Sequence, residues 1–90
     1  MMKERLVQLF AERMGHRPEA IVDMAADGST RQYFRLHWGD GESMVGAVGP
    51  DHDENRAFLS FARAFREAGL PVPEVYAEDR EAGVWLEEDL

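Results

Sequence analysis

The stretch RQYFRLHWGDGESMVGAV, residues 31–48, decides the fold of this 90-residue chain. Its first part, 31–38, is rich in aromatic and bulky side chains that favour β-strands. Gly39-Asp40-Gly41 then supplies a hairpin turn, because glycine tolerates the positive φ angles that tight turns require. Residues 43–48 return as a second strand, which the glycine at position 46 weakens. The stretch therefore predicts two antiparallel strands joined by a tight turn.

The residues before this hairpin predict a third strand and a helix. Residues 20–26 read as a short strand, and the turn cluster Asp27-Gly28-Ser29-Thr30 joins it to the hairpin. Three consecutive strands with short connections favour an antiparallel meander. Further upstream, residues 2–14 repeat large apolar side chains at four-residue spacing (Leu6, Phe10 and Met14), which predicts a helix. We expect this helix to pack at the edge of the sheet.

A second helix is predicted after Gly49-Pro50. Asp51 precedes Glu54 by three residues, which is an aspartate version of the capping box that begins helices. Apolar side chains then recur at helical spacing and predict one strongly aromatic face that packs into the core: Phe58, Phe61, Ala62 and Phe65. Gly69 is expected to end the helix, because glycine adopts the left-handed conformation of a helix C-terminus at little cost.

The last part of the chain predicts two more strands. Leu70-Pro71-Val72-Pro73 is an extended connector, because proline restricts the residue before it. Residues 74–77 and 84–86 read as strands with a turn at 80–83. The predicted fold is α+β, with a five-stranded antiparallel sheet packed by one long helix and an additional N-terminal helix. We expect residues 1–90 to form a single domain.

Composition limits the functions open to the chain. Its formal net charge is −8, from 18 acidic and 10 basic residues, which argues against a module that binds duplex nucleic acid. Cysteine is absent, which excludes disulfides and thiolate metal sites. No apolar run approaches the roughly 18 residues that a membrane span needs. We expect a cytoplasmic protein with no membrane partner.

Four segments, in the right order, resemble a known family. DGSTRQYFRL at 27–36 is similar to a glycine- and serine-containing turn followed by an aromatic strand. ENRAF at 54–58 resembles the start of a C-helix, GLPVPEV at 69–75 a helix-to-strand connector, and WLEEDL at 85–90 a fifth strand entering a hinge. Together they resemble the N-terminal lobe of the aminoglycoside phosphotransferase and choline kinase-like family, which has a protein-kinase-like fold. The similar branch is that of the bacterial N-acetylmuramate and N-acetylglucosamine kinases.

The resemblance implies the nucleotide-facing lobe of a transferase. The full-length protein is expected to use ATP and Mg²⁺ to phosphorylate a sugar or aminoglycoside hydroxyl. The catalytic residues of the family lie in a later, C-terminal lobe, so the resemblance places none in this chain and implies that the chain is truncated before that lobe and inactive without it. The positions that match the family's nucleotide-binding segments are Gly28, Ser29, Thr30, Arg31, Arg35, Glu54, Glu87, Glu88, Asp89 and Leu90.

One feature departs from the usual kinase pattern. Many kinases hold nucleotide phosphates with a lysine on the third strand, paired with a C-helix glutamate. Residues 43–48 contain no lysine, and the single lysine of the chain is Lys3. Arg31 or Arg35, on the neighbouring strand, is the candidate replacement cation.

Simpler interpretations of the same residues stay open. The segment 28–30 is equally a plain turn, Glu54 a helix-capping residue, and 87–90 an exposed acidic strand end. The cluster Asp51-His52-Asp53 is not expected to bind a metal, because the side chains of adjacent helical residues diverge.

Three hypotheses follow for the whole chain. It is the lobe of a kinase, a stand-alone binding or regulatory module of the same shape, or an unrelated α+β domain. The first predicts the C-terminal catalytic lobe and nucleotide as partners. It also predicts an exposed apolar surface near residues 84–90, through which the isolated chain would self-associate.

Overall fold

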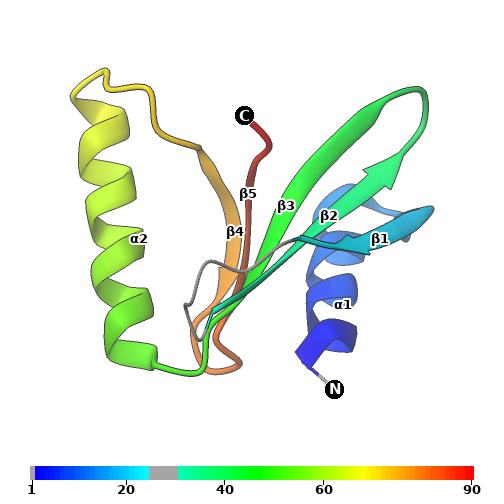
Figure 1. The fold of residues 1–90 in the computed structure, drawn as a ribbon, viewed down its shortest axis with the longest axis horizontal. Helices are drawn as coiled ribbons and strands as arrows, with labels where there is room; N and C mark the ends of the chain where they lie inside the picture. The colour runs from blue at the N-terminus through cyan, green and yellow to red at the C-terminus, as the bar shows by residue number, and fades with distance from the viewer. Residues whose placement is uncertain (1, 25–30) are drawn as a thin grey trace.

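A computed structural model describes residues 2–24 and 31–90. The elements follow the predicted order: α1 (Met2–Met14), β1 (Ala20–Asp23), β2 (Gln32–Trp38), β3 (Glu42–Val48), α2 (His52–Glu67), β4 (Val75–Asp79) and β5 (Val84–Glu88). The five strands form one antiparallel sheet in the order β1-β2-β3-β5-β4 (Figure 1). The predicted α+β fold is confirmed. The predicted turn at 27–30 lies outside the described residues.

The β2–β3 hairpin forms the centre of the sheet. Tyr33 pairs with Ala47 and Arg35 with Val45, in continuous register up to the turn. Gly39 and Gly41 have φ angles of 57° and 79°, which residues with a side chain rarely adopt. Because side chains alternate along each strand, the hairpin sends apolar residues to one face and a mixed polar and aromatic set to the other.

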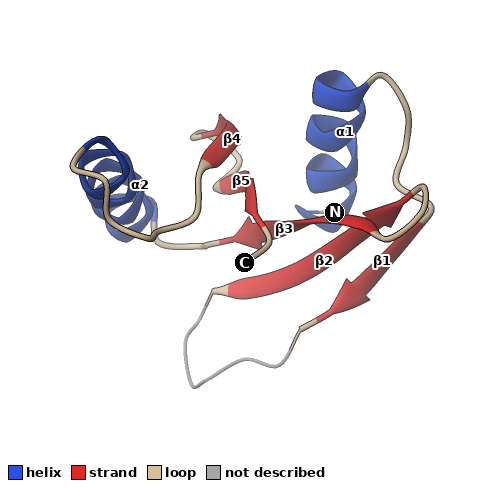
Figure 2. Ribbon diagram, turned by 90° about the horizontal axis from the view of Figure 1, so that it is seen from above, coloured by secondary structure: helices blue, strands red, loops and turns tan. Residues whose placement is uncertain are grey.

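Helix α1 covers the first face of the sheet. It lies against β3, β4 and β5 (Figure 2), and its side chains enter the larger core cluster: Leu6, Leu9, Phe10, Phe34, Leu36, Met44, Val48, Val84 and Leu86. The expectation that this helix packs at the sheet edge is wrong. A Cβ on Gly46 would clash with the Leu6 side chain, so the glycine in β3 permits the close approach of α1 to the face.

Helix α2 packs on the other side of the sheet, and its orientation differs from the prediction. The residues it buries are Asn55, Leu59 and Ala62, whereas Phe61 and Phe65 are 61% and 43% exposed. The prediction that the whole phenylalanine stripe lies in the core is therefore wrong. Phe58 alone of the three rings packs against the smaller core cluster of Ala47, Leu59 and Trp85.

The rotation of α2 about its axis has an identifiable cause. The Asn55 side chain is buried, and its Nδ2 donates to the Gly49 carbonyl oxygen at 2.8 Å. This bond fixes the line Asn55–Leu59–Ala62 toward the sheet, because residues at i, i+4 and i+7 share one helix face. Phe61 and Phe65 are turned away from that line and stack on each other, with ring centroids 5.9 Å apart.

Both ends of α2 are built as the sequence predicts. The Asp51 Oδ1 accepts a hydrogen bond from the Glu54 N–H at 3.1 Å, which confirms the N-cap. At the other end, Gly69 has a φ of 82°, and the Gly69 and Leu70 N–H groups donate to the carbonyls of Arg66 and Phe65. This is the Schellman arrangement that ends a helix. In the described part of the chain, neither helix has the length and apolar character to cross a membrane.

Candidate functional site

The candidate site is the face of the sheet opposite α1, which we call the open face. It is defined by alternate residues of three strands: Tyr33 and Arg35 of β2, Ser43, Val45 and Ala47 of β3, and Trp85 and Glu87 of β5, with Asp89 just beyond β5. The register aligns them in rows, because Ala47 pairs with both Tyr33 and Trp85, and Val45 pairs with both Arg35 and Glu87. Side chains along a strand alternate between the two faces of a sheet. The sequence 85–89 therefore already indicates that Trp85, Glu87 and Asp89 share one face.

Arg35 is held by the last residues of the chain. Its Nε donates to the Asp89 Oδ2 at 2.7 Å and its Nη2 to the Asp89 Oδ1 at 3.1 Å. The Ser43 hydroxyl donates to the same Oδ2 at 2.6 Å. These bonds, with that to Arg35 the stronger, lower the pKa of Asp89. Arg35 therefore fixes the segment after β5 to the middle of the sheet.

Arg31 lies over the aromatic part of the open face. Its guanidinium carbon is 4.8 Å from the centre of the Phe58 ring and 5.1 Å from that of Trp85, which is cation–π geometry. Its Nη1 also donates to the Tyr33 hydroxyl at 3.2 Å. The side chain is half-buried, so the structure sets the cationic group in one place between α2 and the sheet.

Glu87 is the buried acid of the open face. Only 7% of the residue is exposed, and its Oε1 accepts a hydrogen bond from the Trp85 Nε1 at 2.8 Å. Burial raises the pKa of Glu87, and the Trp85 bond and the positive charge of Arg31 oppose that rise. The interpretation of 87–90 as an exposed acidic end is wrong for Glu87, although Leu90 is 75% exposed.

The remaining predicted positions lie beside this face or among the residues that the structure does not describe. Glu54 is exposed in the first turn of α2, where its backbone N–H bonds to the Asp51 cap. The Glu88 Oε1 accepts from the Arg66 Nη1 at 3.3 Å and from the Glu74 N–H at 3.2 Å. Gly28, Ser29 and Thr30 lie outside the described residues. The structure thus brings together Arg31, Arg35, Glu87 and Asp89.

Three residues that support the site were not predicted from the sequence. Ser43 completes the Asp89 site, and Tyr33 and Trp85 contact Arg31. Tyr33 and Trp85 lie within segments that resemble the family but were not among the predicted site residues, and Ser43 lies outside those segments. It also expected an apolar surface near 84–90, whereas Val84, Trp85 and Leu86 are buried. The described residues contain no group of three or more His, Asp or Glu side chains arranged to hold a metal ion.

Comparison with known proteins gives one relative. The chain is 37% identical over 87 residues to the N-acetylmuramate/N-acetylglucosamine kinase of Pseudomonas aeruginosa. The match covers 94% of this chain and 26% of that kinase, so the chain spans about a quarter of the length of its relative. No protein-family model matches the chain. The chain therefore has a kinase as a relative, and the match includes most of the open face.

Proposed function

We propose that this chain is the ATP-binding lobe of a bacterial kinase that transfers phosphate to a sugar hydroxyl. The observation that carries the proposal is the match to a sugar kinase over 94% of the chain, in a segment that folds as the α+β lobe expected. Because the match spans only about a quarter of that kinase, the proposal for these residues is nucleotide binding. Phosphate transfer, and the Mg²⁺ that accompanies ATP, are proposed for a polypeptide that includes the remaining length of the relative.

The open face supplies a reason to choose Arg31 as the phosphate contact. Arg35 commits Nε and Nη2 to the two oxygens of Asp89. Arg31 lies against the ring faces of Phe58 and Trp85 and donates to the Tyr33 hydroxyl, and its charge acts on the Glu87 carboxyl. A guanidinium has five N–H donors in a planar fork that suits phosphate oxygens. Arg31 is therefore the proposed replacement for the strand lysine that the chain lacks.

The segment after β5 is the proposed contact for the base of the nucleotide. Asp89 holds this segment against β2 and β3 through Arg35 and Ser43, so its backbone groups are presented from a fixed position. A preorganised backbone edge recognises a flat heterocycle with little loss of conformational entropy on binding. Glu87 and Asp89 are not proposed to contact phosphate, because their carboxylates repel it. Their proposed role is to hold this segment in place.

A segment exchange tests the proposal. The matched segment of the Pseudomonas kinase is replaced by this chain, and phosphate transfer from ATP to N-acetylglucosamine and N-acetylmuramate is measured. We expect transfer to persist, to fall by about tenfold or more with Arg31→Gln because a charge-assisted phosphate contact is lost, and to stay unchanged with Arg17→Gln. A folded chimera that binds no ATP, or one in which both variants behave alike, contradicts the proposal.

A further inference from the structure

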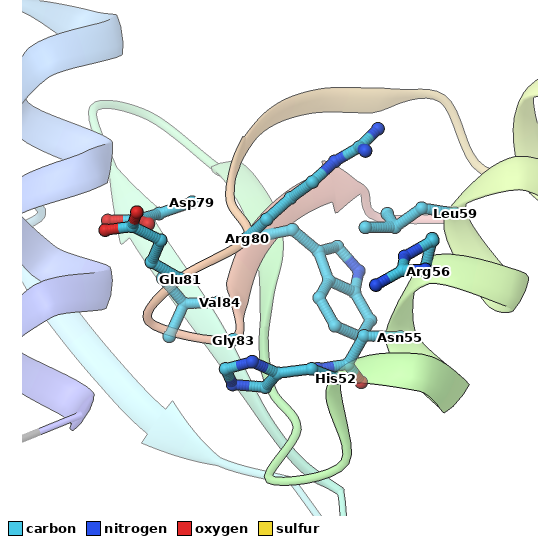
Figure 3. A pocket seen from close by; sticks show the side chains of 10 residues that line it. His52, Asn55, Arg56, Leu59, Asp79, Arg80, Glu81, Gly83 and Val84 are labelled. Carbon is cyan, nitrogen blue, oxygen red and sulfur yellow. The ribbon is translucent and has the colours of Figure 1, made fainter.

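The outer side of α2 is an exposed apolar surface. Figure 3 shows the inner side of the helix, where the Asn55 and Leu59 side chains point toward the turn that joins β4 to β5. On the outer side, Phe61 and Phe65 are 61% and 43% exposed, and Leu70, just beyond the helix, is 49% exposed. Helix α2 stands at one side of the molecule in Figure 1, so this surface faces away from the sheet and from α1.

This surface is too large to be a set of scattered apolar residues. Phe61 and Phe65 stack with ring centroids 5.9 Å apart, and the Leu70 N–H donates to the Phe65 carbonyl, so Leu70 begins beside Phe65. With roughly 200 Å² for a whole large apolar side chain, the exposed parts of these three amount to about 300 Å². An exposed apolar patch of that size often marks a site of interaction.

The spacing of the exposed apolar residues indicates that the partner is another helix. Ala57, Phe61, Ala64 and Ala68 follow one another at intervals of four, three and four residues, and all four are exposed. We call these four residues the α2 seam. Intervals of three and four residues are those by which two helices pack the side chains of one between the side chains of the other.

The sizes of the seam residues suit a second copy of α2 that runs in the opposite direction. With a two-fold axis beside residues 62 and 63, Phe61 of each copy lies opposite Ala64 of the other, and Ala57 lies opposite Ala68. Each large ring then meets a small side chain, as close packing requires. A parallel pair would instead place Phe61 on Phe61 and leave gaps between facing alanines. The seam is therefore complementary to itself in the antiparallel arrangement, which gives a closed two-fold dimer.

The distribution of charge is compatible with this partner. The seam residues, Phe65 and Leu70 carry no charge. The helix as a whole is balanced, although the net charge of the chain is −8, because it has three acidic and three basic residues: Asp53, Glu54, Glu67, Arg56, Arg63 and Arg66. The excess acidic charge that would drive two copies apart thus lies on other elements. A strongly basic or strongly acidic partner would find no excess of opposite charge on this helix.

We propose that this chain forms a symmetric dimer through the α2 seam, with the two α2 helices antiparallel. Two copies of the surface bury on the order of 1,000 Å² in total, which is the lower limit for a specific interface. The dimer is therefore weak, with a dissociation constant of about 10–500 μM. The seam contains no residue of the open face, so the inference does not rest on the proposed kinase function.

Sedimentation equilibrium of the 90-residue protein tests the dimer. We expect reversible dimerisation over a loading range of about 10 μM to 1 mM. Ala64→Glu sets a carboxylate against Phe61 of the partner and should weaken dimerisation at least about tenfold. The position is exposed in the single chain, so circular dichroism should show an unchanged fold. Gln8→Glu adds the same charge at an exposed position of α1 and should leave dimerisation unchanged.

Disulfide cross-linking tests the direction of the two helices. The chain has no cysteine, so Ala64→Cys and Ala57→Cys each introduce a single thiol. In the antiparallel dimer the two copies of residue 64 are offset by about 5 Å along the helix axis, and the two copies of residue 57 by about 16 Å. A disulfide requires Cα atoms within about 7 Å. We therefore expect a cross-linked dimer with Ala64→Cys that is at least about tenfold more abundant than with Ala57→Cys.

Several results overturn the proposal. One is a protein that stays monomeric up to about 1 mM, where association is too weak for specific recognition. Others are dimerisation that Ala64→Glu leaves unchanged, or equal cross-linking at positions 57 and 64, which a parallel pair would give. The chimera with the Pseudomonas kinase should dimerise in the same concentration range. A monomeric chimera would show that the rest of the longer polypeptide covers the seam instead.

Discussion

Arg35 and Asp89, which are 54 residues apart in the sequence, form a two-point ion pair that fastens the segment after β5 to the centre of the sheet. Ser43 donates to the same carboxylate, so β2, β3 and the segment after β5 meet at one group. The pair depends on the alternation that sends Arg35 and Asp89 to the open face. The register of the sheet therefore determines where the segment after β5, the proposed hinge, is held.

Removing the Asp89 charge tests this fastening. The pKa of Asp89 is lowered in the folded protein, so ionised Asp89 stabilises the fold at neutral pH, and this stabilisation is lost as the pH falls below its unfolded value of about 3.9 and through the folded pKa. Asp89→Asn should therefore lower the melting temperature at pH 7, and the gap to the unsubstituted protein should close in acid. Thermal unfolding followed by circular dichroism from pH 7 to 3 measures this, and a gap that does not depend on pH contradicts it.

Removing the charge of Glu87 should have the opposite effect on stability. Burial raises its pKa, so the folded state binds a proton more readily than the unfolded state, and the ionised carboxylate opposes folding at neutral pH. Glu87→Gln keeps an oxygen to accept from the Trp85 Nε1 and should raise the stability at pH 7. As the pH falls through the folded pKa toward about 4.3, the unsubstituted protein should gain on the variant. Urea unfolding at several pH values tests this; a variant less stable at pH 7 would count against it.

Asn55 should be a main determinant of how α2 sits on the sheet. Asn55→Ala leaves the buried Gly49 carbonyl without its donor, and we expect a loss of roughly 1–3 kcal/mol in the free energy of unfolding. Ser60→Ala, an exposed position on the same helix, is the matched control and should change the value by less than about 0.5 kcal/mol. Equal effects of the two substitutions would show that the Asn55 bond contributes nothing specific.

The corrected orientation of α2 predicts a contrast between neighbouring positions. Leu59→Ala should lower the free energy of unfolding by roughly 2–5 kcal/mol, because Leu59 is only 3% exposed and belongs to the smaller core cluster. Phe61→Ala removes an exposed ring and should change the free energy of unfolding by no more than about 0.5 kcal/mol. If the isolated chain self-associates, Phe61→Ala should also reduce the association seen by sedimentation velocity, with Ser60→Ala as control. A large stability loss from Phe61→Ala would restore the original core assignment.

The sequence predicted the sheet well because its signals are local. Turn glycines such as Gly39 and Gly41 and the alternation in 31–48 place each strand next to its neighbour. The rotation of α2 could not be predicted in the same way. It is set by the hydrogen bond between Asn55 and the carbonyl of Gly49, six residues earlier. Helical periodicity alone predicts instead that the more apolar face, which carries the phenylalanines, lies against the sheet.

The candidate site was predicted in part for similar reasons. The positions of Arg31, Arg35, Glu87 and Asp89 came from a family resemblance, and their convergence follows from strand alternation once the register is known. The partners that hold them, Ser43, Tyr33 and Trp85, come from three different strands. The pairings of Ser43 with Asp89 and of Trp85 with Arg31 join distant parts of the chain and leave no pattern along it, whereas Tyr33 lies only two residues from Arg31.

We propose that the open face binds the nucleotide through Arg31. The most direct measurement is an NMR titration of the ¹⁵N-labelled 90-residue protein with ATP, comparing the unsubstituted chain with Arg31→Gln and Arg17→Gln. We expect saturable shifts at Arg35, Ser43, Glu87 and Asp89, with an ATP affinity that Arg31→Gln weakens about tenfold or more and Arg17→Gln leaves unchanged. Shifts confined to the α1 side of the sheet, or an affinity that both variants leave unchanged, would contradict it.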